Sequence, residues 1–182
     1  QRALADAAAV GMVEKIIGFL FLVPSTLLST VSAMGAQNIG AGREERARQT
    51  LRYAIGLAVA YGLTAALIMQ GAAEAAVGLF TDASTAEGMQ VVRLGGQYMR
   101  GYVWDCVFAG IHFCCSGYFC AIGRSGFSFL HNILAIVLVR IPGAYLASVL
   151  FPTTLLPMGF ATAAGSLASV LMCLAVLLAL RR

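Results

Sequence analysis

Residues 159–180 read GFATAAGSLASVLMCLAVLLAL, a run of about 22 residues without a charged side chain. At about 1.5 Å per residue, a helix of this length crosses a hydrocarbon core of about 30 Å. Residues 16–34 form a second uncharged run of about 19 residues. Hydrophobic residues make up 60% of the chain and charged residues 11%, with a mean hydropathy of +0.85. A water-soluble domain of this size needs more charge to cover its surface, so the sequence predicts an integral membrane protein.

The rest of the chain divides into similar segments. None shows the strict alternation of a barrel strand, and each is about twice as long as such a strand needs to be. Backbone groups in lipid must be satisfied internally, which a helix achieves by itself. We therefore predict an all-α integral membrane protein, a polytopic bundle of five transmembrane helices. The approximate spans are residues 7–34, 53–79, 98–122, 132–151 and 159–180.

Arginines concentrate in the segments that would lie on one face of the membrane. Seven are found there, against two in the opposite segments, Arg2 and Arg93. Cytoplasmic loops carry an excess of basic residues, so this face is predicted to be cytoplasmic. The expected location is the cell (inner) membrane, with several passes and a cytoplasmic C-terminus. The seven are Arg43, Arg46, Arg48, Arg52, Arg124, Arg181 and Arg182.

The beginning of the chain is unusual for a complete protein. It opens on Gln1, without a start methionine and without the apolar core of a cleavable signal. An odd number of spans and an extracytoplasmic start suggest that earlier helices are missing. We therefore expect residues 1–182 to be the C-terminal lobe of a longer transporter, without its N-terminal lobe and one preceding helix.

The cysteines indicate neither a metal site nor a disulfide framework. All five fall within predicted spans, where a thiol usually behaves as a small apolar packing residue. No pair of C-x-x-C motifs and no histidine cluster accompanies them, so we predict no metal site and no cofactor. The chain also has no phosphate-binding loop of the ATP-driven pumps. The five are Cys106, Cys114, Cys115, Cys120 and Cys173.

Small residues recur where helices would meet. Gly110 and Gly117 lie on one segment, and Gly165, Ser166 and Ser169 lie on another. In lipid, helices associate by close backbone approach through Gly, Ala and Ser. These positions are interpreted as packing contacts.

Ionisable residues at membrane depth are the most informative for function. A charge at the centre of the bilayer costs at least about 2.5 kcal/mol, so it usually faces protein or a wet cavity. Asp105, Ala109, His112 and Ser116 are spaced three or four apart and form one polar stripe on a helix. The stripe could line a cavity or make a hydrogen-bonded helix contact, and the cavity is the favoured interpretation.

Depth along the helices suggests which residues can meet. Counted from Ile122, Asp105 lies about 25 Å and His112 about 15 Å into the membrane. Arg140, counted from Asn132, lies about 12 Å in, which argues against an ion pair with Asp105. We predict that Arg140 faces the protein interior near the level of His112, and that Pro142 bends the helix close by.

A second group of charges shares the outer third of the membrane with Asp105. It consists of Glu14, Lys15 and Glu74. A buried acid near a lysine and further acids is where protonation and cation binding compete. Lys15 could instead extend its amine to the surface, and Glu74 could lie at the water interface. The candidate ion- or substrate-binding residues are Asp105, His112, Arg140, Lys15 and Glu14.

Several motifs resemble one transporter family. The first is PSTLLSTVSAMGAQNIGAGR at residues 24–43, followed by Arg46-Ala47. In order there follow YMR at 98–100, SGYF at 116–119, GRS at 123–125, RIPGAY at 140–145 and PMG at 157–159. Each motif is degenerate, but their order and spacing across essentially the whole chain resemble the multidrug and toxic compound extrusion (MATE) transporters.

This resemblance implies a twelve-helix protein of two six-helix lobes, of which this chain would supply the eighth to the twelfth helix. Family members export cationic or amphipathic organic compounds in exchange for Na⁺ or H⁺. In one branch an aspartate on the tenth helix takes part in cation coupling, and Asp105 lies on the matching helix. The surrounding residues do not reproduce that branch, and acids used elsewhere in the family are absent. The implied partners are an organic cation, a coupling cation, membrane lipid and the N-terminal lobe, with no nucleic acid.

Two other functions remain open at this point. A lipid-linked precursor flippase of a related two-lobed type would share the helices but should offer more basic residues for a pyrophosphate. A membrane-embedded enzyme could use Asp105 and His112 as an acid–base pair. Those two residues lie about 10 Å apart along one helix, too far for a direct hydrogen bond, so we expect no enzyme activity.

Overall fold

The computed structural model describes residues 2–180, which fold into helices joined by short turns. No strand occurs among these residues, so the predicted all-α fold class is confirmed. The helices are α1 (Arg2–Leu20), α2 (Leu22–Gly40), α3 (Glu44–Gly78), α4 (Ala86–Tyr102), α5 (Asp105–Ala121), α6 (Ser125–Ala135), the π-helical η1 (Ile136–Arg140), α7 (Ile141–Leu150) and α8 (Leu156–Ala179).

Four helical segments in this part of the chain are long and apolar enough to cross a membrane. They are Leu4–Gly40, Glu44–Gly78, Ser125–Leu150 and Leu156–Ala179. The pair α4–α5, bent by 43° at its break, is a fifth candidate if it counts as one span. The polytopic membrane bundle is therefore confirmed.

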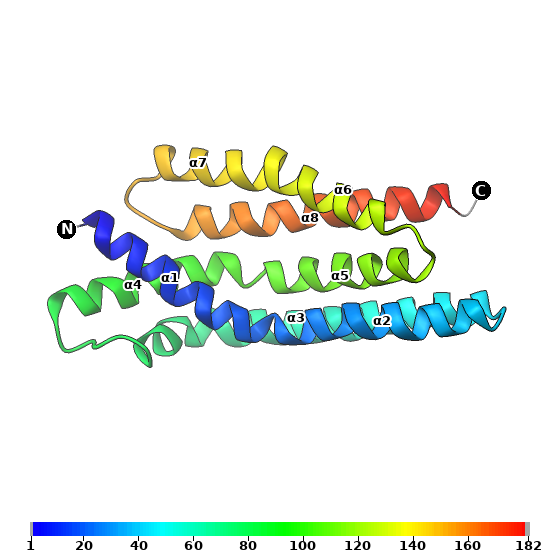
Figure 1. Cartoon of the computed structure of the whole chain (residues 1–182). Coiled ribbons are helices and arrows are strands. Elements are labelled where there is room, and N and C mark those ends of the chain that lie inside the picture. The colour runs from blue at the N-terminus through cyan, green and yellow to red at the C-terminus, as the bar shows by residue number, and fades with distance from the viewer. Residues whose placement is uncertain (1, 181–182) are drawn as a thin grey trace.

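The connections between spans alternate between the two ends of the bundle (Figure 1). The α2–α3 turn, the α5–α6 turn and the end of α8 lie at one end, and the α3–α4 and α7–α8 connections lie at the other. Arg43 and Arg124 occupy turns at the first end. Gln1, Arg181 and Arg182 lie outside the described residues. Which end faces the cytoplasm stays a prediction.

Several helices begin earlier than their apolar segments. Helix α4 begins at Ala86 rather than Tyr98, and α6 begins at Ser125 rather than Asn132. The Thr85 side chain accepts a 3.0 Å hydrogen bond from the Gly88 amide, which is the usual way to cap a helix start. The predicted spans therefore omit about three turns of α4, which carry several polar residues, and about two turns of α6, which are mostly apolar.

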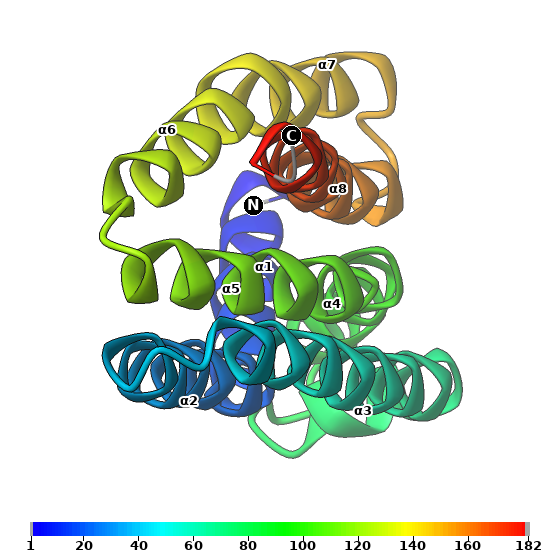
Figure 2. The same ribbon diagram turned by 90° about the vertical axis from the view of Figure 1, so that its right-hand side faces the viewer.

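Helix α5 lies between the α2–α3 pair and the group of α6 and α8 (Figure 2). It approaches α3 closely because glycines leave room for backbone. A Cβ atom added to Gly62 would lie 2.7 Å from Val107 Cα, and one added to Gly110 would lie 2.9 Å from Ala58 Cβ. The predicted role of Gly110 as a packing residue is confirmed.

Helices α3 and α4 are joined by a reciprocal polar contact. The Arg100 side chain donates to the Gln70 carbonyl, and the Gln70 amide donates to the Arg100 carbonyl, both at 3.1 Å. Arg100 also forms a 3.1 Å ion pair with Glu74. Glu74 is half-exposed and engaged with Arg100, away from the polar stripe.

Pro142 follows a π-helical stretch. The Ile141 amide donates to the Ile136 carbonyl, five residues back instead of four. Proline lacks an N–H and its ring crowds the preceding turn, so a widened turn relieves the clash. The predicted disturbance near Pro142 therefore takes the form of a π-helical turn, and residues 125–150 remain one continuous helical segment.

Candidate functional site

The polar stripe of α5 is buried inside the bundle. Asp105 and Ser116 are each 1% exposed, and His112 is 4% exposed. They lie on the face of α5 opposite Val107 and Gly110, which contact α3. Because four residues span slightly more than one helical turn, positions 105, 109, 112 and 116 stay on one face. The face points toward α6 and α8, which pack against α5.

His131 joins this stripe from α6. Its Nε2 lies 2.9 Å from the Ser116 hydroxyl, and its ring centroid lies 5.5 Å from that of His112. His131 is not among the predicted site residues, because the predicted span begins one residue later, at Asn132. Sequence gives no clear signal for it; only the structure shows that His131 and Ala135, four apart, are the buried positions of α6.

Helix α8 supplies hydroxyl groups along the same contact. Thr162, Ser166 and Ser169 are buried and follow one another at helical spacing. The Ser169 hydroxyl donates a 3.3 Å hydrogen bond to the His131 carbonyl, and Ser166 lies beside the Asp105 carboxyl group. Ser166 and Ser169 were interpreted from sequence as packing residues. In the structure they also make polar contacts with the buried cluster.

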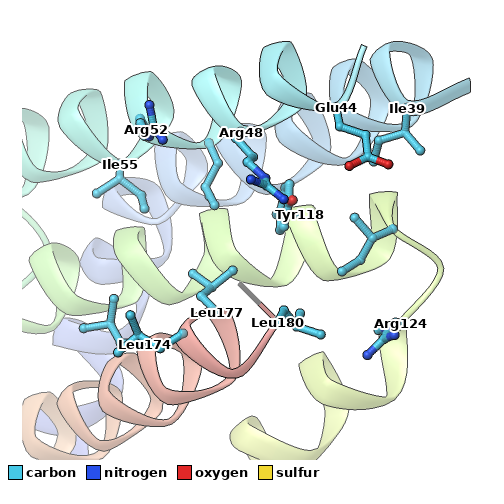
Figure 3. A pocket seen from close by; sticks show the side chains of 13 residues that line it. Ile39, Glu44, Arg48, Arg52, Ile55, Tyr118, Arg124, Leu174, Leu177 and Leu180 are labelled. Atoms are coloured by element: carbon cyan, nitrogen blue, oxygen red, sulfur yellow. The ribbon is translucent and has the colours of Figure 1, made fainter. Parts of the chain in front are cut away.

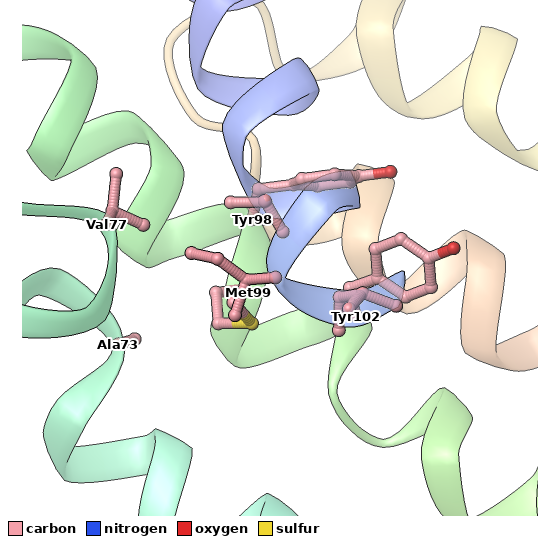
Figure 4. Packing of buried hydrophobic residues seen from close by; sticks show 8 residues of the cluster. Ala73, Val77, Tyr98, Met99 and Tyr102 are labelled. Atoms are coloured by element: carbon pink, nitrogen blue, oxygen red, sulfur yellow. The ribbon is translucent and has the colours of Figure 1, made fainter. Parts of the chain in front are cut away.

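Arg140 reaches the cluster from η1. One guanidinium nitrogen donates a 2.9 Å hydrogen bond to the Tyr102 hydroxyl, and its carbon lies 5.8 Å from the centre of that ring. In Figure 4 the hydroxyls of Tyr98 and Tyr102 point away from Ala73 and Val77, on the side opposite the apolar packing of α3. The prediction that Arg140 faces the protein interior is confirmed.

The predicted depth of Arg140 needs correction. Its Cβ lies 3.1 Å from the position that a Gly165 Cβ would occupy, and the next residue on α8, Ser166, lies beside Asp105. Arg140 is therefore level with Asp105 rather than well below it. The helix begins at Ser125, so the rise to Arg140 is about 22 Å instead of about 12 Å. Arg140 acts electrostatically on both Asp105 and His112.

Three polar atoms in this cluster have no hydrogen-bond partner among the described residues. They are Asp105 Oδ1, His112 Nδ1 and His131 Nδ1, all shielded from solvent. Among the side chains described, those of residues 4–180, the ion pairs are Arg100–Glu74 and Arg52–Glu45, so Asp105 belongs to none. A buried polar group without a partner costs about 1–3 kcal/mol, and more when it is charged. The cluster is therefore suited to take up a proton, a cation or water.

The structure does not bring Glu14 and Lys15 to Asp105. Both are exposed on α1. Glu14 lines a groove of about 510 Å³ with Asp6, Ser148 and Met158, and the groove does not include Asp105. No hydrogen bond or ion pair in the described part of the chain joins Lys15 to Asp105, and the basic side chain that acts on Asp105 is Arg140.

A larger groove of about 560 Å³ opens at the arginine-rich end of the bundle (Figure 3). Arg48, Arg52 and Arg124 lie around it, and leucines of α8 form its apolar wall. Neither groove contains Asp105 or His112. Within the described residues the polar stripe is buried against α6 and α8, as in the helix-contact interpretation. That it lines a cavity in the two-lobed protein stays a prediction.

Comparison with known proteins adds one match. A family model described as MatE matches residues 5–146, which cover the chain from α1 through most of α7. Neither the curated proteins nor the solved structures give a match.

Proposed function

The chain belongs to the MatE family of membrane transporters, and we propose that it forms the C-terminal lobe of a two-lobed cation-coupled antiporter. The proposed substrates are cationic or amphipathic organic compounds, exported in exchange for Na⁺ or H⁺. The proposed location is the cell membrane, with the arginine-rich end in the cytoplasm. Alternating access requires two lobes around a shared site, so transport is proposed only for the full-length protein.

The observation that carries this proposal is the environment of Asp105. Its carboxyl group is buried at membrane depth, one oxygen has no partner, and the guanidinium at its level is engaged with Tyr102. An ionised carboxylate with only a hydroxyl beside it and no ion-pair partner is costly in this setting, so the group should bind a proton or a cation. Alternate occupation by a coupling ion and an organic cation is what an exchanger needs.

A lipid-linked precursor flippase is the second candidate. It would need basic groups to hold a pyrophosphate, and Arg48, Arg52 and Arg124 around the groove of Figure 3 are such groups. The buried cluster on α5 instead contains Asp105 with a single arginine, a composition that favours a cationic ligand. Stimulation by a pyrophosphate-linked lipid, without export of cationic dye, would favour the flippase.

The test is the Asp105→Asn substitution in the full-length protein. Efflux of a cationic dye is measured in cells or proteoliposomes and normalised to the amount of protein in the membrane. Efflux driven by the ion gradient should fall about tenfold or more, because asparagine cannot bind the coupling proton or cation and coupling free energies typically correspond to about 5–150-fold. Abundance should stay near that of the unmodified protein.

Asp82→Asn is the matched control, because Asp82 is an exposed acid in the α3–α4 connection. It should leave efflux unchanged. If Asp105 only compensates the charge of Arg140, Asp105→Asn should instead reduce membrane abundance, and adding Arg140→Met should restore it. Efflux and ion dependence equal to the unmodified protein in Asp105→Asn would exclude the coupling role.

A further inference from the structure

We propose that His112, His131 and Ser116 form a buried proton-binding site between α5 and α6, so that the coupling ion of this transporter is a proton. The inference deepens the proposed function and rests on it for the role of the site in exchange. The presence of the site itself follows from contacts that are independent of substrate.

The two imidazoles have unused hydrogen-bonding capacity. A neutral imidazole has one N–H donor and one bare nitrogen. Ser116 occupies Nε2 of His131, which leaves its Nδ1 without a partner, and His112 Nδ1 also has none. Whichever tautomer His131 adopts, one buried donor or acceptor remains unmatched. A bridging water can hydrogen-bond to these atoms, and a bare imidazole nitrogen that takes up a proton can donate a hydrogen bond to such a water.

The composition of the cluster favours a proton over a metal ion or Na⁺. Hard cations such as Na⁺ prefer several oxygen ligands, whereas the two orphan atoms here are nitrogens with one hydroxyl nearby. Transition metals bind imidazole but need further ligands. Within residues 2–180 no group of three His, Cys, Asp or Glu side chains is placed to hold a metal.

The surroundings limit the pair to one proton. The ring centroids are 5.5 Å apart, so a charge on one ring opposes a charge on the other. Arg140 from η1 also acts on His112, and Asp105 lies two turns away on the same face of α5. Helix α8 presents the hydroxyls of Ser166 and Ser169, which carry no charge. Phe113 makes an edge contact with His112, and Phe119 makes one with His131.

This arrangement explains how exchange would work. An organic cation bound near Asp105 would add a positive charge about 10 Å from His112 along α5. With Arg140 nearby, a second positive charge on the histidine pair is then disfavoured. Proton uptake at the histidine pair and substrate binding at Asp105 would therefore oppose each other electrostatically, in addition to any direct competition at Asp105. This satisfies the requirement of an antiporter that only one of them is bound at a time.

The test uses the full-length transporter in proteoliposomes, with His112→Gln, His131→Gln and the control Asn132→Gln. Glutamine keeps a donor and an acceptor but does not titrate. Three rates are measured: dye efflux driven by a pH gradient without Na⁺, efflux driven by a Na⁺ gradient at equal pH, and dye exchange, which needs no coupling ion.

The unmodified protein and Asn132→Gln should respond to the pH gradient and not to Na⁺. Each histidine variant should lose pH-driven efflux about tenfold, within the usual range of a coupling free energy, while dye exchange continues. Efflux driven by Na⁺, or a full pH response in either variant, would overturn the inference. If His131→Gln fails to insert, His131→Asn is the replacement.

Absence of any dye exchange in the unmodified protein would instead remove the proposed function. The histidine site can then be tested separately by following the pH titration of ¹⁵N-labelled histidine by NMR. The signal that disappears in each glutamine variant identifies the histidine that was replaced. A shared titration, in which His112→Gln alters the pH response of His131, supports the site. Independent titrations, or none, would end the proposal.

Discussion

The two faces of α5 make contacts of opposite kinds. On one face Val107 meets Gly62 and Gly110 meets Ala58, with backbones in direct contact. On the other face Asp105, His112 and Ser116 meet α6 and α8 with three unmatched polar atoms in the cluster. A membrane helix can thus use one side to set its position and the other to carry chemistry. Mutations on the face toward α3 should therefore affect mainly stability, and mutations on the polar face should affect mainly function.

The largest effect on stability is expected on the dry face. Gly62→Val would bring a Cβ within 2.7 Å of Val107 Cα, where only backbone could move aside. Overpacking of this kind costs about 1–3 kcal/mol or more. The thermal unfolding midpoint and the membrane abundance of the full-length protein should both fall sharply.

Gly56→Val is the matched control on the same helix, because nothing lies within 4 Å of an added Cβ at Gly56. Its effect should be small. Equal losses in Gly62→Val and Gly56→Val would mean that helix propensity, and not the contact with α5, determines the result.

An intermediate effect is expected where the polar face meets η1. Tyr102→Phe removes the hydroxyl that accepts the hydrogen bond from Arg140 but keeps the aromatic ring beneath the guanidinium. Losing this bond should lower the free energy of unfolding by about 1 kcal/mol. That value lies between those typical of hydrogen bonds to charged groups and of side-chain hydrogen bonds between membrane helices. The unfolding midpoint is compared with that of Tyr145→Phe, whose ring is exposed. No difference between the two would argue that the bond is unimportant.

The smallest effect is expected for Ser116→Ala, which breaks the 2.9 Å contact with His131. Hydrogen bonds between membrane helices average about 0.6 kcal/mol, so the unfolding midpoint should scarcely change. Ser148→Ala, on the exposed surface of α7, provides the reference value. A loss as large as that of Gly62→Val would contradict the distinction between a structural and a chemical face.

Much of this arrangement was accessible from sequence, because its periodicity is local. The spacing of Asp105, His112 and Ser116 defines one face of α5 whatever surrounds the helix. Hydropathy likewise locates the apolar centre of each span. It does not show where a helix starts: α6 begins seven residues before the predicted span, which is why His131 was missed and Arg140 was placed too low. Which residues the serines of α8 contact depends on how α5, α6 and α8 pack together. No local sequence pattern predicts those contacts.

The order in which the chain is made gives the polar face a further consequence. During synthesis α5 enters the membrane before η1 exists, so Asp105 arrives without Arg140 nearby. An aspartate at the centre of an inserting helix costs about 2.5–3.5 kcal/mol. The break between α4 and α5 lies immediately before Asp105, so the two halves of this span need not insert as one straight helix. Arg140, by contrast, emerges when Tyr102 is already in place. Biogenesis therefore favours an acid in the earlier helix and its guanidinium neighbour in the later one.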